Sequence, residues 1–220
     1  MARGGIERRL QAAGEALLAI RELRVEQDDG TCPQIAAELV ALLTKRDWPG
    51  DRELVDLLSH AQDEPTATVR EMSSARRPLR ADLDQVADLL EGSLDMGFGG
   101  VLDMQTGDAW PELVLEDWLD DEPRPDPDQL PERYLFIPNE GSRDAWRDMR
   151  DFASTLDDDQ TRSQLLDAIE GRGAFGRVKR VLDHHDELWP AWHAYSNEAR
   201  CGRARAWLHD AGYDALPAVR

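Results

Sequence analysis

The chain has 220 residues, of which 41% are hydrophobic, so it is long enough for one large domain or two small ones, each with its own core. Its formal net charge of -19 argues against nonspecific binding to nucleic acid or to an anionic membrane, because both need a basic surface. No stretch approaches the roughly 18 apolar residues of a membrane span, and the N-terminus does not have the form of a signal peptide. Cys32 and Cys201 lie far apart and form no disulfide or zinc motif. We therefore expect a cytoplasmic protein that has no contact with a membrane.

Apolar residues recur at spacings of three and four in the N-terminal part of the chain, which is the pattern of amphipathic helices. The pattern predicts helices over residues 6–25, from Thr31 to a break at residues 48–50, and from Asp51 to a stop at residues 63–65. Ile35 is expected on the apolar face of the second helix, and Asp51 is expected to cap the third.

Residues 66–80 contain few apolar side chains and are compatible with a linker or with a frayed helix. Helical spacing returns after Asp82, and Gly92 is a natural end for that helix. We therefore predict an N-terminal helical region over residues 1–92 and a separate C-terminal α+β domain over residues 93–220.

After Gly92 the spacing of apolar residues changes from that of helices to that of strands. Residues 97–104 and 108–113 are predicted to form a hairpin, with Gly107 supplying the positive φ angle of the turn, and residues 134–138 a third strand. Residues 112–128, between these strands, are acidic and contain prolines, which is typical of a solvated loop but also suits a basic partner.

The chain is helical again from Ser142, a candidate cap, to about residue 211. Glycines at 171 and 173 divide two of these helices, and Phe175, Val178 and Leu182 are expected to face the core from the second. The predicted fold class is therefore α+β and predominantly helical, with a small antiparallel β-sheet packed by C-terminal helices.

Four strings of the chain occur in a recognisable order. They are Asp82-Leu-Asp-x-x-Ala-x-x-Leu, Leu102-Asp-Met-Gln-Thr-Gly-Asp, Arg133-Tyr-Leu-Phe-Ile-Pro and Glu170-Gly-Arg-Gly-Ala-Phe-Gly-Arg-Val-Lys. Together they resemble a bacterial group, uncharacterised protein family 0158 of the UPF series, over about residues 78–213. Gly176 and Val178 replace a larger residue and an aromatic one in the family's pattern. The resemblance implies a small bacterial α+β domain without an assigned activity, and it supplies no catalytic residues.

The last of these strings concentrates positive charge in an acidic protein. We call Arg172, Arg177, Lys179 and Arg180 the basic corner. With the flexible main chain around Gly173 it could bind phosphate or another anion, although the string is neither a P-loop nor a dinucleotide motif. The alternative interpretation is a structural turn between helices, with the arginines paired to carboxylates.

Other side chains with functional potential are scarcer. His184, His185 and His193 do not have the spacing of a metal motif, so no metal and no cofactor is expected. No nucleophile, base and orienting group can be assembled, so enzymatic activity is disfavoured. Trp189 and Trp192 share a helix face, where they could form part of the core or of a protein interface.

The leading hypothesis is a non-catalytic binding or regulatory protein that acts through protein contacts. A second hypothesis is a nucleic-acid-linked role, either as an acidic mimic or through the basic corner with Arg200, Arg203 and Arg205. A third is a phosphate or nucleotide binder, or an enzyme, that uses the Gly-Arg-Gly hinge. The sequence indicates neither the identity of a partner nor an oligomeric state.

Overall fold

The structure is a computed structural model and describes residues 31–63, 76–92, 99–112 and 131–217. The helix predicted over residues 6–25 and nearly all of the acidic segment lie outside the described residues. In chain order the elements are α3 (Thr31–Arg46), α4 (Asp51–Asp63), β1 (Arg77–Ala81), α6 (Leu83–Leu90), β2 (Gly100–Asp103), β3 (Ala109–Pro111), β4 (Tyr134–Ile137), α8 (Arg143–Ser154), α9 (Asp159–Ile169), α10 (Ala174–Leu182), the 3-10 helix η3 (Asp186–Leu188), α11 (Trp189–Asp210) and β5 (Tyr213–Pro217). The predicted α+β, predominantly helical class is confirmed.

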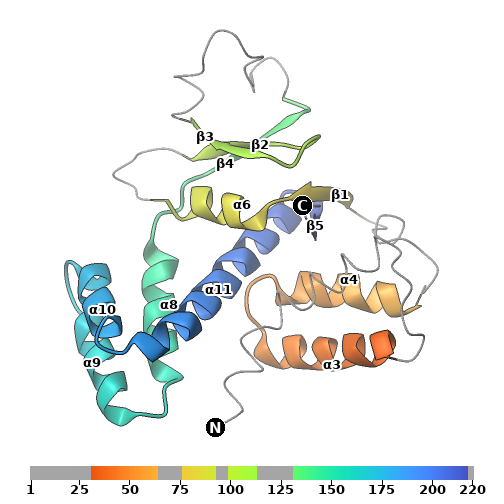
Figure 1. Cartoon of the computed structure of the whole chain (residues 1–220). Coiled ribbons are helices and arrows are strands. Elements are labelled where there is room, and N and C mark those ends of the chain that lie inside the picture. The colour runs from red at the N-terminus through yellow and green to blue at the C-terminus, as the bar shows by residue number, and fades with distance from the viewer. Residues whose placement is uncertain (1–30, 64–75, 93–98, 113–130, 218–220) are drawn as a thin grey trace.

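Helix α11 is the central element of the fold. Figure 1 shows it running diagonally through the molecule, with α8, α9 and α10 on one side of it and α3 and α4 on the other. The three-stranded sheet and α6 lie over its C-terminal half. No helix in the described part of the chain is long and apolar enough to cross a membrane.

The predicted hairpin and third strand form one antiparallel sheet in the order β3-β2-β4. Leu102 and Ile137 are fully buried on the face that packs against α6 and α11. Gly107, at φ 82°, makes the turn as predicted, and a Cβ there would lie 2.1 Å from the carbonyl oxygen of Arg80. Glycine is therefore required at this position by its conformation and by the close approach of a second chain segment.

A second pairing joins the two ends of the C-terminal region. Strand β1 is parallel to β5, with Leu79 opposite Ala215, and both of these residues are buried in the core with α11. The undecided stretch before residue 80 thus ends in a strand. Strand β1 and helix α6 precede residue 92 but share a core with the residues that follow it. The division into domains 1–92 and 93–220 stays a prediction.

Helices α3 and α4 are in contact with α11 through an ion-pair cluster. Arg46 at the end of α3 contacts Asp51 at 2.5 Å and Glu198 of α11 at 2.8 Å, and all three side chains are buried. Helix α4 starts at Asp51, where a helix start was predicted, but the Asp51 carboxylate accepts hydrogen bonds from Arg46 and from the main-chain N–H of Trp48 rather than from the first turn of α4. Ile35 was predicted to face the core but is 45% exposed, because Ala36, Leu39 and Leu43 form the buried stripe of α3.

Candidate functional site

The hinge between α9 and α10 depends on two glycines with left-handed main-chain conformations. Gly171 has φ 74° and Gly173 has φ 76°, and α10 begins directly afterwards at Ala174. Glycine adopts this region without the steric cost that other residues incur. These two positions allow α9 and α10 to pack side by side at the end of the molecule (Figure 1).

Arg177 uses its guanidinium to cap the C-terminus of α9. Its Nε donates to the carbonyl of Ala168 at 3.0 Å, and its Nη2 donates to that of Gly171 at 3.3 Å. Further donors reach the carbonyls of Glu170 and Arg172. The last carbonyls of a helix have no hydrogen-bond partner within the helix. A cation that donates hydrogen bonds to them therefore stabilises the helix end. Arg177 is therefore occupied in the structure of the hinge.

The arginine cap gives a testable difference within the basic corner. We expect Arg177→Ala to lower the free energy of unfolding by about 1–2 kcal/mol, because several helix-end carbonyls lose a charged donor. Lys179→Ala, which removes a cation from an exposed position of the same helix, should change it by less than about 0.5 kcal/mol. Urea denaturation of both variants measures the difference. Equal effects would show that the cap contributes nothing specific.

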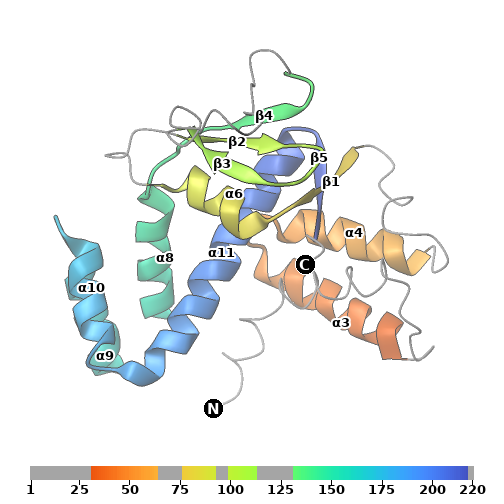
Figure 2. The same cartoon turned by 45° about the horizontal axis from the view of Figure 1, so that its top comes forward.

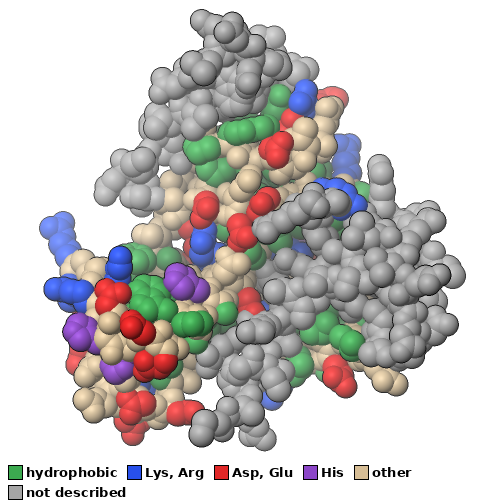
Figure 3. Space-filling view, in the orientation of Figure 1, with side chains coloured by type: hydrophobic (Ala, Val, Ile, Leu, Met, Phe, Trp, Pro, Cys, Tyr) green, Lys and Arg blue, Asp and Glu red, His purple; other side chains and the backbone are tan. Residues whose placement is uncertain are grey.

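The other three cations of the basic corner are exposed. Arg172, Lys179 and Arg180 form no ion pair with any residue of the described segments, and Arg180 donates from Nε to the carbonyl of Gly176 at 3.3 Å. Arg172 and Arg177 thus differ in role, since one is free and the other is bound to main-chain oxygens. Figure 3 shows Lys and Arg side chains gathered at the edge of the molecule over α10.

A shallow groove of about 420 Å³ separates α9 from α10. The groove is lined by Gln164, Asp167, Ala168, Arg177, Arg180, Val181 and His184. Two of these side chains are arginines and one is a carboxylate. Nδ1 of His184 lies 2.6 Å from the carbonyl oxygen of Arg180, which fixes the ring beside the groove.

Phe175 does not face the core, contrary to the sequence-based prediction. It is 49% exposed, whereas Ala174, Val178 and Leu182 are buried. The buried stripe of α10 therefore runs through positions spaced by four, and Phe175 lies about 100° from its first member. Phe175 and Lys179, four residues apart on α10, therefore share an exposed face of this helix.

Trp189 and Trp192 pack on the core formed by α8, α9 and α10, and both are partly buried. Trp192 meets Phe152 edge to face at 5.3 Å between ring centroids, and Trp189 stacks on the exposed ring of His193 at 5.0 Å. Packing accounts for most of their surface. Their role in an interface stays a prediction.

The histidines of this region contact neighbouring polar groups. Among the described residues, no three His, Cys, Asp or Glu side chains are grouped so that they could hold an ion. His185 lies 3.4 Å from Gln164 and 3.5 Å from Glu187, while His184 contacts a main-chain carbonyl.

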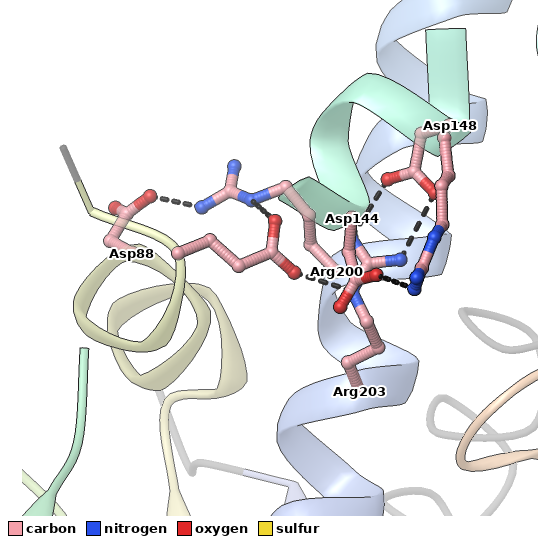
Figure 4. Close-up of polar contacts among 7 residues, drawn as sticks. Asp88, Asp144, Asp148, Arg200 and Arg203 are labelled. Carbon is pink, nitrogen blue, oxygen red and sulfur yellow. Dashed lines mark hydrogen bonds and ion pairs between the residues drawn. The ribbon is translucent and has the colours of Figure 1, made fainter. Parts of the chain in front are cut away.

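Two arginines of the nucleic-acid hypothesis are internal. Arg203 binds Glu91 at 2.5 Å and Asp148 at 2.7 Å, and Arg205 is 1% exposed. Arg200 contacts Asp88 at the surface of the same network (Figure 4). Sequence analysis missed this network because the partners of Arg203 lie 112 and 55 residues away along the chain.

Residues from three of the four strings, Asp82, Asp103 and Arg133, have structural roles in this fold. Asp103 is 1% exposed and binds Arg133 at 2.7 Å, which ties the hairpin turn to the start of β4. Burial alone would raise the pKa of Asp103, but hydrogen bonds from Arg133 and from the N–H of Gln105 lower it below its ordinary value. Asp82 caps α6 by accepting from the N–H groups of Asp84 and Gln85.

Comparison with known proteins gives one match. The model of an uncharacterised protein family, UPF0158, matches residues 79–216, which is more than half of the chain. Neither the curated proteins nor the solved structures contain a significant match. The matched range extends from β1 to β5 and includes the four strings described above. The chain therefore belongs to the uncharacterised protein family UPF0158.

Proposed function

We propose that the protein is a non-catalytic cytoplasmic binding or regulatory protein, and that it contacts an acidic surface of a partner protein through the basic corner. The observation that supports this proposal is the exposure of Phe175 beside Arg172 and Lys179, whose charges no described carboxylate neutralises. An apolar side chain surrounded by free cations suits a partner in which carboxylates surround an apolar residue.

The protein-binding hypothesis fits the exposed phenylalanine and the free cations better than phosphate binding or nucleic-acid binding does. The cap formed by Arg177 leaves the hinge without a convergent pair of arginines for phosphate. The internal positions of Arg203 and Arg205 remove two cations from any surface that could follow a nucleic-acid backbone. The acidic segment that would support nucleic-acid mimicry lies outside the described residues.

The proposal can be tested by photo-cross-linking. A photoreactive phenylalanine analogue replaces Phe175 in the full chain, and the same analogue replaces Phe136, an exposed phenylalanine on the sheet, as the control. We expect one acidic protein to be captured from position 175 and absent from position 136. Capture of the same proteins from both positions would contradict the proposal.

Charge reversal then tests the captured partner in purified form. The test variant carries Arg172→Glu, Lys179→Glu and Arg180→Glu, and the control carries the same charge change at three exposed cations elsewhere, Lys45→Glu, Arg52→Glu and Arg143→Glu. We expect the test variant to weaken binding at least about tenfold more than the control, and high salt to weaken the wild-type complex. A melting-temperature increase with inorganic phosphate that Arg172→Ala abolishes would favour the phosphate hypothesis instead.

A further inference from the structure

Strand β4 pairs with a described strand on one side only. It lies at the outer edge of the three-stranded sheet (Figure 2), and no other described strand pairs with it there. The N–H of Met104 donates to the carbonyl of Arg133 at 2.9 Å, so Arg133, Leu135 and Ile137 bond to β2. Alternate residues of an antiparallel strand turn their main-chain groups to the opposite side. The N–H and C=O groups of Tyr134 and Phe136 therefore point away from β2.

This edge has few of the features that protect strands from pairing. Residues 134–137 include no charged residue and no proline. Phe136 is 57% exposed and ends a row with Val101 and Trp110 on the face of the sheet opposite α6 and α11, where Val101 and Tyr134 are buried. A continuous apolar row that stops at an open edge can be extended by another strand.

We propose that β4 pairs with β4 of a second copy of this chain, in antiparallel orientation, around a two-fold axis at Leu135. Tyr134 of each copy then lies opposite Phe136 of the other, so that four main-chain hydrogen bonds form between outward-facing groups. Both side chains of each facing pair lie on the same face of the combined sheet. The two three-stranded sheets then form one six-stranded sheet, in which the apolar row of each copy continues into Tyr134 of the other.

The charges and the proline near the strand disfavour a two-fold axis at Phe136. A two-fold axis at Phe136 would set Tyr134 against Pro138, which has no N–H, and would bring Glu132 against Glu140. With the axis at Leu135, Glu132 lies opposite Pro138 and no two like charges face each other. A shift by one residue would place the apolar side chains of the two copies on opposite faces.

The expected dimer is weak and depends on concentration. A contact of four residues per strand is smaller than the roughly 800 Å² per partner of a standard protein interface. The net charge of -19 opposes association of two copies, so added salt should strengthen the dimer. Added salt is thus expected to strengthen the dimer but to weaken partner binding at the basic corner. The two proposals can therefore be distinguished by their dependence on salt.

Sedimentation velocity of the full chain at rising concentration, in low and in high salt, provides the test. Phe136→Pro removes an outward N–H without removing a bond to β2, and Phe136→Asp adds charge at the edge. Phe175→Asp is the control, since that side chain is 49% exposed at a different part of the surface. We expect dimer for the wild type and the control, and monomer for both Phe136 variants. A wild type that stays monomeric at every concentration, or a dimer that survives both Phe136 variants, overturns the proposal.

Disulfide cross-linking tests the register in a background of Cys32→Ser. Leu135 would face its own copy at a non-hydrogen-bonded position, where the Cα atoms of antiparallel strands lie about 4.5 Å apart, within disulfide range. Leu135→Cys should therefore form a covalent dimer on oxidation, at least about tenfold faster than Phe136→Cys. Faster cross-linking of Phe136→Cys, or none from either position, would contradict the two-fold axis at Leu135.

Discussion

Arg203→Met is expected to destabilise the protein by about 3–5 kcal/mol at pH 7, because Asp148 loses its cation inside the protein and Glu91 keeps only the more distant Arg200. Arg203 on α11 binds Glu91 at the end of α6 and Asp148 of α8, whose side chains are 9% and 8% exposed (Figure 4). The substitution removes one charge but leaves two carboxylates of like sign close together. Urea denaturation of both proteins measures the loss.

A surface pair provides the matched control. Arg147 lies on α8 and binds Asp144 at 2.5 Å, but the two side chains are 60% and 31% exposed. Arg147→Met should therefore cost no more than about 1 kcal/mol, because water and salt already screen this pair. Similar losses in the two variants would mean that burial does not determine the strength of the Arg203 network.

The same network predicts how the loss depends on pH. Burial raises the pKa of Asp148 above its ordinary value, although hydrogen bonds from Arg203 oppose this effect. A carboxyl whose pKa is raised on folding favours the folded state at low pH, and that advantage disappears as the pH rises through the folded pKa. Without Arg203 the pKa rises further, so the destabilisation by Arg203→Met should shrink as the pH falls from 7 toward about 5. A loss that is independent of pH would contradict this account.

Elements that depend on neighbouring residues could be predicted from the sequence. Helical spacing predicts a helix after Asp82, and in the structure Asp82 caps α6 by accepting from the main-chain N–H groups of Asp84 and Gln85. Gly107 makes the hairpin turn for a similarly local reason. Ser142 occupies the predicted cap position of α8, but its side chain makes no capping hydrogen bond. The position of a helix cap is therefore easier to predict than the hydrogen bond that its side chain makes.

Features that depend on distant partners could not be predicted. Strand β1 has few apolar residues, and it forms because it pairs with β5. The paired residues Arg77 and Tyr213 are 136 positions apart in the sequence. Spacing alone also allowed Phe175 to be placed on the buried stripe of α10, and only packing against α9 shows that Ala174 occupies it.

The candidate site combines both kinds of information. The sequence identified the basic corner because four cations stand close together in an acidic chain. It could not show that Arg177 would turn toward the carbonyls of α9 while Arg172 stayed free, since that choice depends on the main-chain path through two positive φ angles. A sequence thus shows where charged residues cluster, but not which role each of them has in the fold.

Gly50→Ala is expected to lower the free energy of unfolding by about 3 kcal/mol, as the sum of main-chain strain and overpacking. Gly50 joins α3 to α4 at φ 81°, and a Cβ there would lie 2.1 Å from the carbonyl oxygen of Gly202 on α11. The oxygen belongs to a helix backbone and cannot move aside without moving α11. The substitution should therefore separate α3 and α4 from α11, at the place where Arg46 meets Glu198.

Gly212→Ala separates the two causes, because Gly212 has φ 94° but no atom within 4 Å of an added Cβ. It should lose only the strain of a left-handed alanine, about 1–2 kcal/mol. Hydrogen exchange then locates the effect: in Gly50→Ala, protection should fall in α3 and α4 and persist in the sheet, whose core does not include these helices. Equal losses in the two glycine variants would show that the contact between Gly50 and Gly202 is not tight. Loss of protection throughout the chain would instead show that α3 and α4 unfold together with the rest of the protein as one cooperative unit.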